Sequence, residues 1–358
     1  MSELVLEISS LRKSYGETAA LRSVDLSVYR GELVTLLGPS GSGKTTLLKV
    51  IAGFEAPSGG EVRLRGRDIS RLAPARRGVG MVFQHYALFP HMTVAQNIGY
   101  GLKLRRTPRA ERERRVEAMM ELLRLEGLQA RYPRQLSGGQ QQRVALGRAL
   151  VYDPQVILMD EPLGALDRAL RIEMEQEIRT LHRDLDATIV YVTHDQREAL
   201  ALSDRIAVMR DGQIEGLGSP ESLYANPPNA FVASFFANAN LLAIEHAEPA
   251  SEGSARVRCA GSEISCRANL GSPPAPSGEV VLAVRRHSLR RVPSEGALRL
   301  EGVVAELLLF GDEQQVGLDV EGAGRVVATM QTRDCHDLAL GARVELWVPA
   351  GEPVLVGR

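Results

Sequence analysis

The stretch that decides the fold is Gly38-Pro-Ser-Gly-Ser-Gly-Lys-Thr45, which fits the pattern G-x-x-x-x-G-K-[ST]. The apolar residues 34–37 before it predict a buried strand, and residues 47–52 after it predict a helix. Glycines let backbone N–H groups approach phosphate oxygens, and the positive end of the following helix adds attraction. Strand, loop and helix together predict a phosphate-binding loop, with a flexible Gly/Ser turn as the alternative.

Two side chains of this loop have separate expected roles. Lys44 is expected to contact the β- and γ-phosphates of a nucleotide, and the Thr45 hydroxyl to bind Mg²⁺. Only four of the 43 basic residues are lysine, so a lysine at this position is informative. The other expected nucleotide-binding residues of this segment are Gly38, Pro39, Ser40, Gly41, Ser42, Gly43 and Thr46.

A pair of acids follows a second apolar run, Val156-Ile-Leu-Met-Asp160-Glu161. At the carboxyl edge of a parallel sheet, next to a phosphate loop, Asp160 is expected to hold Mg²⁺. Glu161 is then placed to act on a water in line with the γ-phosphate, as a general base. An acid pair at a plain strand-end turn is the alternative, and the phosphate loop earlier in the chain favours the functional interpretation.

A second glycine-rich turn, Leu136-Ser-Gly-Gly-Gln140, opens another predicted helix. A serine followed by two glycines suits a helix N-terminus that binds an anion. An ordinary capped helix start would have the same pentapeptide, so this turn is weak by itself.

The chain divides into two regions of different texture. Residues 1–236 alternate short apolar runs with helical patterns, as in a mostly parallel sheet covered by helices. An apolar stripe every three or four residues predicts a core-facing helix over residues 170–185. Residues 247–277 are rich in Ser, Gly, Pro and Ala, and the short alternating runs beyond them predict a small all-β domain. We therefore expect domains at 1–238 and 278–358, with a linker and the start of the extension at 239–277.

Composition excludes several classes of protein. The 358 residues carry a formal net charge of −1, which gives no overall attraction to nucleic acid or anionic lipid. No apolar run approaches the roughly 18 residues of a membrane span, and the first residues lack a secretory pattern. Three cysteines without C-x-x-C spacing argue against a disulfide framework and a zinc site. A cytoplasmic location is expected.

The motif set GPSGSGKT, LSGGQQQR and VILMDEP, with Gln84 and His194 in order, resembles the nucleotide-binding domain of an ATP-binding cassette (ABC) importer. The resemblance covers roughly residues 4 to 240. It implies the P-loop NTPase fold of an ABC cassette, α/β with a parallel sheet core and a helical subdomain at about 85–150. The C-terminal part resembles, more loosely, the small OB-like β-barrel extension called TOBE.

The resemblance assigns roles to further residues. Tyr15 is implied to stack on adenine, Gln84 to reach Mg²⁺ and the attacking water, and His194 to contact the γ-phosphate. In such proteins the signature residues Ser137, Gly138, Gly139 and Gln140 close on ATP held by the other subunit, and the loop that carries Asp167 crosses to it. The chain departs from the family with Gly164 and Gly147, where serine and alanine are common. We expect altered loop flexibility there rather than loss of function.

Partners follow from the same resemblance. One chain carries one copy of each ATP-binding surface, so a homodimer with two shared ATP sites is implied. A transmembrane permease is implied as a partner at the cytoplasmic face of the membrane, and an extracytoplasmic solute-binding protein indirectly, with no nucleic acid. The apolar cluster of Tyr86, Leu88, Phe89, Pro90 and Met92 is a candidate contact for the permease. Its alternative is packing within its own subdomain.

The transported substrate is weakly constrained. The cassette closely resembles the polyamine importer branch, and ferric iron, sulfate and phosphonate importers share nearly the same sequence. Alternatives of another class are a soluble ABC ATPase of DNA repair or translation and a regulatory, anion-sensing C-terminal domain. For the latter, the arginines at 285, 286, 290 and 291 form either an anion site or a solvated edge.

Overall fold

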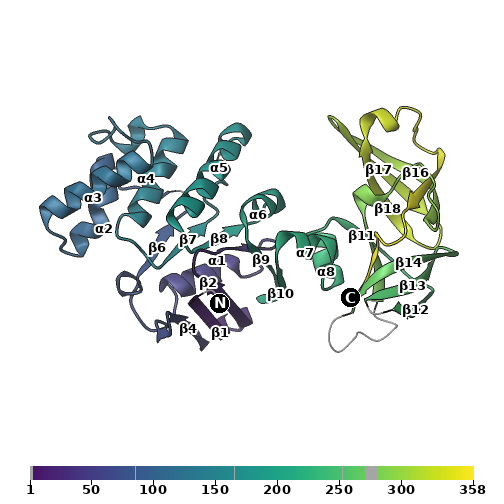
Figure 1. Cartoon of the computed structure of the whole chain (residues 1–358), viewed down its shortest axis with the longest axis horizontal. Coiled ribbons are helices and arrows are strands. Elements are labelled where there is room, and N and C mark those ends of the chain that lie inside the picture. Colours follow the sequence, from purple (N-terminus) through teal and green to yellow (C-terminus); the bar gives the residue numbers. More distant parts are fainter. Residues whose placement is uncertain (1–2, 85, 165, 252, 271–279) are drawn as a thin grey trace. The chain divides into compact units, whose positions relative to one another are not determined.

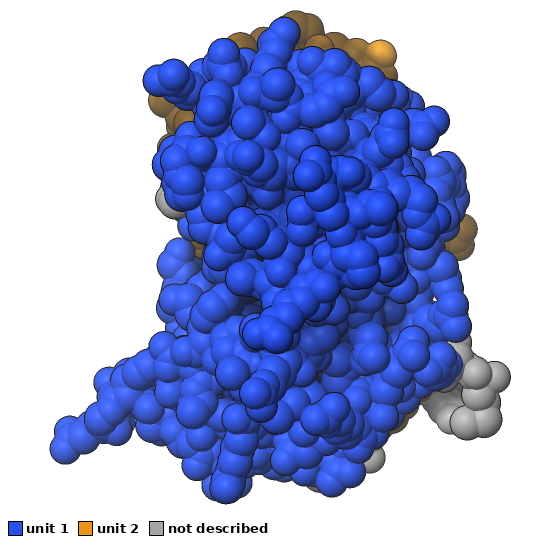
Figure 2. Space-filling view, turned by 90° about the vertical axis from the view of Figure 1, so that its left-hand side faces the viewer, with its two compact units in different colours: residues 1–220 blue, residues 221–358 orange. Residues whose placement is uncertain are grey.

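The computed structural model describes residues 3–84, 86–164, 166–251, 253–270 and 280–358. It divides into two compact units, Met1–Pro220 and Glu221–Arg358, which are coloured separately in Figure 2. Residues 271–277 of the expected linker, and the first two residues of the expected β-domain, lie outside the described residues. Each unit is described by itself.

Unit 1 contains two β-sheets. The smaller one is antiparallel, with the order β2 (Thr18–Tyr29), β1 (Leu4–Tyr15), β4 (Gly59–Leu64) and β5 (Arg67–Asp68). The larger one has the order β10 (Gln213–Gly218), β9 (Arg205–Arg210), β3 (Leu33–Leu37), β8 (Ile189–Thr193), β7 (Val156–Asp160) and β6 (Val79–Val82). Its neighbouring strands are parallel except for β9 and β10. The predicted parallel sheet core is confirmed.

In the described residues of unit 1, six α-helices connect these strands (Figure 1). They are α1 (Lys44–Ala52), α2 (Val94–Leu104), α3 (Arg109–Leu122), α4 (Gly138–Leu150), α5 (Arg168–Leu185) and α6 (Gln196–Leu202). Helices α2, α3 and α4 gather at one end of the unit, in the region expected to form a helical subdomain. In the α5 stripe, Met174 and Ile178 are fully buried, whereas Leu185 at the end of the helix is 40% exposed.

Two apolar cores hold unit 1 together on opposite sides of the parallel sheet. Alternate residues of β3 and β8 enter different cores: Leu33 and Tyr191 face the helices α2, α4 and α5, while Val34 and Val190 face α1 and the antiparallel sheet. Every residue of these two strands is buried. Such continuous apolar strands are expected in a parallel sheet covered on both faces.

Unit 2 is mostly β-structure. A six-stranded sheet has the order β11 (Ala239–Leu242), β15 (Val280–Arg285), β20 (Val354–Gly357), β14 (Ser262–Asn269), β13 (Ser254–Cys259) and β12 (His246–Ser251). A four-stranded sheet has the order β18 (Gly324–Gln331), β17 (Glu313–Val320), β16 (Leu298–Phe310) and β19 (Arg343–Val348). Both sheets share one apolar core, and the remaining face of the first sheet covers α8 (Ala230–Phe235). The short helix α7 (Pro220–Ala225) precedes α8.

Strands also form in the stretch whose composition predicted a linker. Strands β12, β13 and β14 pair as an antiparallel meander within residues 246–269. Ala255, Val257 and Cys259 of β13 are buried and alternate with exposed residues. Small residues obscure this period of two in the sequence, because Ala255 and Cys259 stand on the buried face together with Val257.

Two further properties concern membranes and thiols. Across the described ranges, every helix is too short or too polar to span a lipid bilayer. Cys259, Cys266 and Cys335 are free and buried. Burial raises the pKa of the Cys259 and Cys266 thiols to about 11, so neither is ionised near neutral pH.

Candidate nucleotide-binding site

The order of the parallel sheet places the predicted site residues together. Strands β3, β8, β7 and β6 are adjacent, and each ends just before one predicted functional segment: the phosphate loop, His194, Glu161 and Gln84 respectively. In open parallel sheets, ligands bind at the carboxyl ends of the strands. Residues that are more than 150 positions apart in the sequence therefore meet at one edge.

The phosphate loop wraps around Lys44. Lys44 is 5% exposed, and its Nζ donates to the carbonyl oxygens of Gly38 (2.8 Å) and Pro39 (3.0 Å). Burial lowers the pKa of Lys44, and the negative charges of Glu161 and Asp160 oppose that shift. The ammonium group is thus bonded to oxygens of the loop itself, which an incoming phosphate can replace.

Two positions of the loop require glycine, one because of a close contact and one because of its backbone angle. A Cβ on Gly38 would lie 2.2 Å from the Met209 carbonyl oxygen. Gly43 has a φ of 100° and caps α1 without a side-chain hydrogen bond, so the first N–H groups of that helix keep no side-chain partner from the cap. The loop is therefore shaped for an anion at the start of α1. Ser40 and Gly41 are exposed, and Ser42 is buried.

Thr45 and Asp160 are adjacent across the sheet edge. Thr45 Oγ1 donates to Asp160 Oδ1 over 3.3 Å. Burial raises the pKa of Asp160, the Thr45 hydrogen bond opposes this, and the nearby Glu161 charge adds to it. Hydroxyl and carboxylate oxygens are ligands that Mg²⁺ prefers, so the donor set fits this ion. Among the described residues, no three His, Cys, Asp or Glu side chains form a metal cluster.

Glu161 lies at the centre of a three-residue cluster. Its Oε2 accepts from Gln84 Nε2 over 3.3 Å, and its Oε1 lies 3.2 Å from His194 Nδ1. The backbone of Glu161 has a φ of 44°, in the left-handed region that non-glycine residues rarely adopt. Such conformations cluster at functional sites, where the surroundings impose them. The structure thus brings together the three predicted catalytic residues.

The segment after Gln84 is fixed by two residues that the sequence analysis missed. Arg148 of α4 donates to the carbonyl oxygens of Tyr86 (2.7 Å) and Ala87 (2.6 Å), whose φ angles are both positive. Asn97 of α2 is fully buried and bonds the backbone of Phe89 in both directions. A polar residue on the apolar face of α2 was the available signal for Asn97.

The second glycine-rich turn caps its own helix. Ser137 Oγ accepts from the Gln140 N–H, and Gln140 Oε1 accepts from the Ser137 N–H, which forms a capping box at the start of α4. Gly139 is buried, and a Cβ there would lie 3.1 Å from Leu170 of α5. Asp167 caps α5 by accepting from the Leu170 N–H at 3.0 Å.

Tyr15 and Thr46 complete the set of predicted residues. Tyr15 ends β1 and is 46% exposed, with Lys13 Nζ 4.8 Å from its ring centroid. The hairpin of β1 and β2 contacts the phosphate loop, because a Cβ on Gly43 would lie 2.7 Å from the Ala20 carbonyl oxygen. Thr46 lies in the first turn of α1 and is half-buried.

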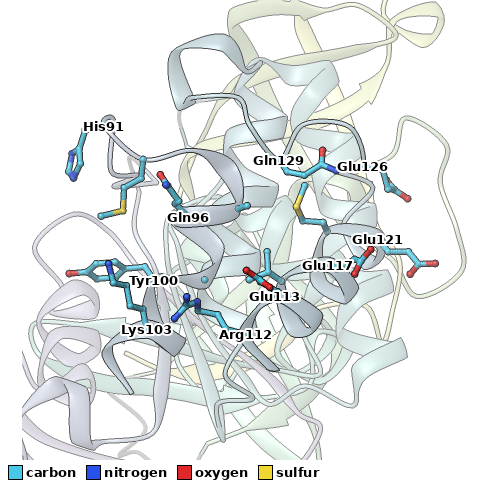
Figure 3. Close-up of a pocket in the computed structure, with 15 residues that line it drawn as sticks. His91, Gln96, Tyr100, Lys103, Arg112, Glu113, Glu117, Glu121, Glu126 and Gln129 are labelled. Atoms are coloured by element: carbon cyan, nitrogen blue, oxygen red, sulfur yellow. The ribbon is translucent and has the colours of Figure 1, made fainter. Parts of the chain in front are cut away.

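A groove of about 990 Å³ opens on the helical part of unit 1, between α2 and α3 (Figure 3). Met92 of the predicted apolar cluster lines it, whereas Tyr86 is buried in the core of the unit. Figure 3 shows the carboxylates of Glu113, Glu117 and Glu121 on α3, which also carries Arg112, and the side chains of Tyr100 and Lys103 on α2. The charged lining residues are Lys103, Arg112, Glu113, Glu117, Glu121 and Glu126.

Comparison with known proteins agrees with this geometry. The family described as "ABC transporter" matches residues 21–164, and "TOBE domain" matches residues 279–356. The spermidine/putrescine import ATP-binding protein PotA of Thermobifida fusca is 46% identical over 347 residues, covering 95% of this chain and 89% of that protein. The chain belongs to the ABC transporter family.

Two other relatives define the extent of the similarity. The sulfate/thiosulfate import ATP-binding protein CysA of Nocardia farcinica is 53% identical over 231 residues, 64% of this chain and 70% of that protein. A solved dimeric structure of the ABC transporter cassette MJ0796 matches with a TM-score of 0.54 and 35% identity, covering 60% of this chain and 98% of that one. The predicted ABC cassette followed by a TOBE domain, and the predicted ATPase class, are confirmed.

Proposed function

We propose that this ABC family member is the ATP-hydrolysing subunit of a polyamine importer, working as a homodimer on the cytoplasmic face of the membrane. The observation that carries the ATPase part is the cluster of Glu161, Gln84 and His194 beside the Lys44 loop. The resemblance to PotA over nearly the whole chain supports the substrate class. We take residues 1–238 as the ATPase domain, 239–277 as the linker and start of the extension, and 278–358 as the TOBE-like domain. Strands β11 to β14 of the middle segment join the six-stranded sheet of unit 2.

ATP binding begins at the phosphate loop. The backbone of residues 38–43 and the Lys44 ammonium bind the β- and γ-phosphates, with Thr46 at the first turn of α1 and the Tyr15 ring against adenine. Thr45, Asp160 and Gln84 would hold Mg²⁺, which neutralises charge on the phosphate oxygens when bound. Burial of Lys44 and Asp160 strengthens their attraction, because the local dielectric is low.

Hydrolysis requires a base next to the γ-phosphate. Glu161 accepts a proton from the attacking water, while Gln84 and His194, each about one hydrogen bond from its carboxylate, orient the water and the γ-phosphate. The signature residues Ser137, Gly138, Gly139 and Gln140, with Asp167, complete the site from the other subunit. The self-capped start of α4 leaves the N–H groups of the two glycines for this contact.

The groove between α2 and α3 is the proposed contact for a short helix of the transmembrane permease. It is continuous with the segment after Gln84, since Phe89 contacts Tyr100 of the groove with ring centroids 4.5 Å apart. A shift of the permease helix would thus displace the segment that carries Gln84. The extracytoplasmic solute-binding protein acts through the permease and makes no contact with this chain.

Uptake by the complete complex tests the substrate. Membrane vesicles containing this chain, its co-purifying permease and the solute-binding protein should accumulate labelled spermidine or putrescine with ATP, and not sulfate. Sulfate uptake without polyamine uptake would favour the second candidate, a sulfate importer, which the 53% identity to CysA supports for the cassette. The same vesicles made with Lys44→Ala should accumulate neither.

A further inference from the structure

The loop that carries His194 is tied down by one buried carboxylate. Glu198 of α6 is 4% exposed, and its Oε2 accepts from Tyr191 Oη (2.9 Å) and Thr193 Oγ1 (2.8 Å). Thr193 Oγ1 in turn accepts from the Asp195 N–H at 3.0 Å. The residues on both sides of His194 are therefore linked to Glu198 Oε2, Thr193 directly and Asp195 through the Thr193 hydroxyl.

Asp195 closes this arrangement. Its Oδ1 accepts from the N–H groups of Arg197 (2.7 Å) and Glu198 (3.3 Å), so the residue after His194 also caps α6. The His194 side chain is 61% exposed, and its Nδ1 lies 3.2 Å from Glu161 Oε1. An exposed ring has few packing contacts to orient it, so its position depends on the backbone that Glu198 holds.

Arg171 connects this loop to a second segment. From the first turn of α5, its Nη1 lies 3.6 Å from Asp195 Oδ2 and its Nε lies 3.8 Å from Glu198 Oε1. Its Nη2 donates to the Leu166 carbonyl oxygen over 3.2 Å. One guanidinium group thus contacts the loop of His194 and the residue that precedes Asp167.

The connection between Arg171 and Glu198 also involves a buried charge. Burial raises the pKa of Glu198, and the hydrogen bonds from Thr193 and Tyr191 oppose that shift. Arg171 Nε is buried and makes no hydrogen bond, so it faces Glu198 as an ion pair. Removing Arg171 leaves the buried Glu198 carboxylate without this cation, which favours movement of the loop.

We propose that Glu198 and Arg171 are positioning residues for ATP hydrolysis. Glu198 fixes the backbone on both sides of His194, and Arg171 ties that loop to the segment of Leu166 and Asp167. The inference rests on the proposed function, in which His194 contacts the γ-phosphate and the Asp167 segment meets the other subunit. Closure of the subunit interface then reaches His194 through a single guanidinium group.

Steady-state ATPase rates of the full-length chain test the positioning role by a double-mutant cycle. Glu198→Ala and Arg171→Ala should each lower kcat by about 10-fold or more and change KM for Mg-ATP by less than about 3-fold. Combined with His194→Ala, neither should lower kcat more than about 2-fold further, because both act through His194. The matched control is Arg183→Ala, on the same helix, 75% exposed and paired with Asp184.

Hydrogen exchange provides a measurement that does not depend on activity. In Arg171→Ala and Glu198→Gln, the amides of Asp195, Arg197 and Glu198 should exchange about 10-fold faster than in the unmodified chain, with no change in Arg183→Ala. Glu198→Gln keeps an acceptor for Tyr191 and Thr193 and removes the charge opposite Arg171. If circular dichroism shows that Glu198→Ala does not fold, Glu198→Gln replaces it in the ATPase measurements.

The failures are distinguishable. Losses of kcat that multiply with that of His194→Ala, or unchanged exchange in both variants, would overturn the positioning role and leave the proposed function intact. Unaltered turnover in His194→Ala would instead remove the role of His194 on which the inference rests. A loss of ATP binding equal to that of Lys44→Ala would also overturn it, since positioning residues act after binding.

Discussion

Helices α1 and α4 both begin at glycine-rich turns, and their N-termini are satisfied in different ways. The start of α1 has Gly43 at the cap, no side-chain hydrogen bond, and the buried Lys44 as its first residue. The start of α4 has a complete capping box of Ser137 and Gln140. An uncapped, cationic N-terminus binds phosphate strongly by itself, whereas a capped N-terminus without a lysine offers a few N–H groups to an anion held elsewhere. The difference is what the proposed sharing of each ATP site between two subunits predicts.

The largest expected effect comes from removing Lys44, the cation that distinguishes the start of α1 from that of α4. Lys44→Ala should reduce ATP affinity by about 100-fold, since a hydrogen bond to a charged group contributes about 1.5–3 kcal/mol, and turnover should be undetectable. Titration with a fluorescent ATP analogue measures the affinity. Lys103→Ala, an exposed lysine in the α2–α3 groove, is the control and should bind ATP normally. An ATPase rate equal to that of the unmodified chain would remove the phosphate-loop assignment.

Glu161→Gln separates binding from hydrolysis. The amide keeps the size of the side chain and loses its basicity, so turnover should fall by about 10²–10⁴-fold while ATP still binds. Saturating Mg-ATP should then hold the chain as a dimer, detected by light scattering. A monomer under these conditions contradicts the shared-site arrangement.

Ser137→Ala tests whether the turn at the start of α4 contributes to hydrolysis as well as to capping. Loss of the cap should cost about 1 kcal/mol of unfolding free energy, and ATP binding to a single subunit should be unchanged. Turnover should fall by about 10-fold, because a hydrogen bond of the shared site is lost. Thr93→Ala is a matched control, since Thr93 forms the same kind of capping box with Gln96 at the start of α2. Equal turnover in the two variants would leave Ser137 a structural cap only.

Gly164→Ala has the smallest expected effect. A Cβ there would lie 3.5 Å from the Glu161 carbonyl oxygen and 3.8 Å from Gln84 Nε2, which are ordinary contact distances. Turnover should change by less than about 3-fold and stability should rise by up to about 1 kcal/mol, because alanine restricts the unfolded chain. Gly38→Ala, with its 2.2 Å contact, should by contrast destabilise the fold. Thermal unfolding and ATPase rates compare the two, and a larger loss in Gly164→Ala would refute the geometry.

Much of the site followed from local patterns. The phosphate loop, the acids after β7 and the capped turn of α4 are each specified within about ten consecutive residues, so strand, loop and helix propensities suffice to locate them. The roles of Gln84 and His194 came from the family resemblance, whereas the strand order that brings them to Glu161 comes from the structure.

Other features depend on contacts between distant residues. Arg148, Arg171 and Glu198 act through carbonyls and carboxylates on other elements, and arginine or glutamate in a helix is usually a surface residue. The strands of residues 246–269 were missed because Val257 and Ile264 are the only large apolar residues among small ones on the buried face of β13 and β14. An acid on the apolar face of a short helix, as at Glu198, was a usable signal.

The central claim is that ATP is bound between the phosphate loop of one copy and the Ser137 turn of another. Cysteine crosslinking tests it directly, with Ser40→Cys in one population of Glu161→Gln chains and Gln135→Cys in a second. Both positions are exposed, and the three native cysteines are buried. A disulfide-linked dimer should form in the mixture only with Mg-ATP, and in neither population alone. No crosslink with nucleotide, or equal crosslinking without it, would contradict the claim.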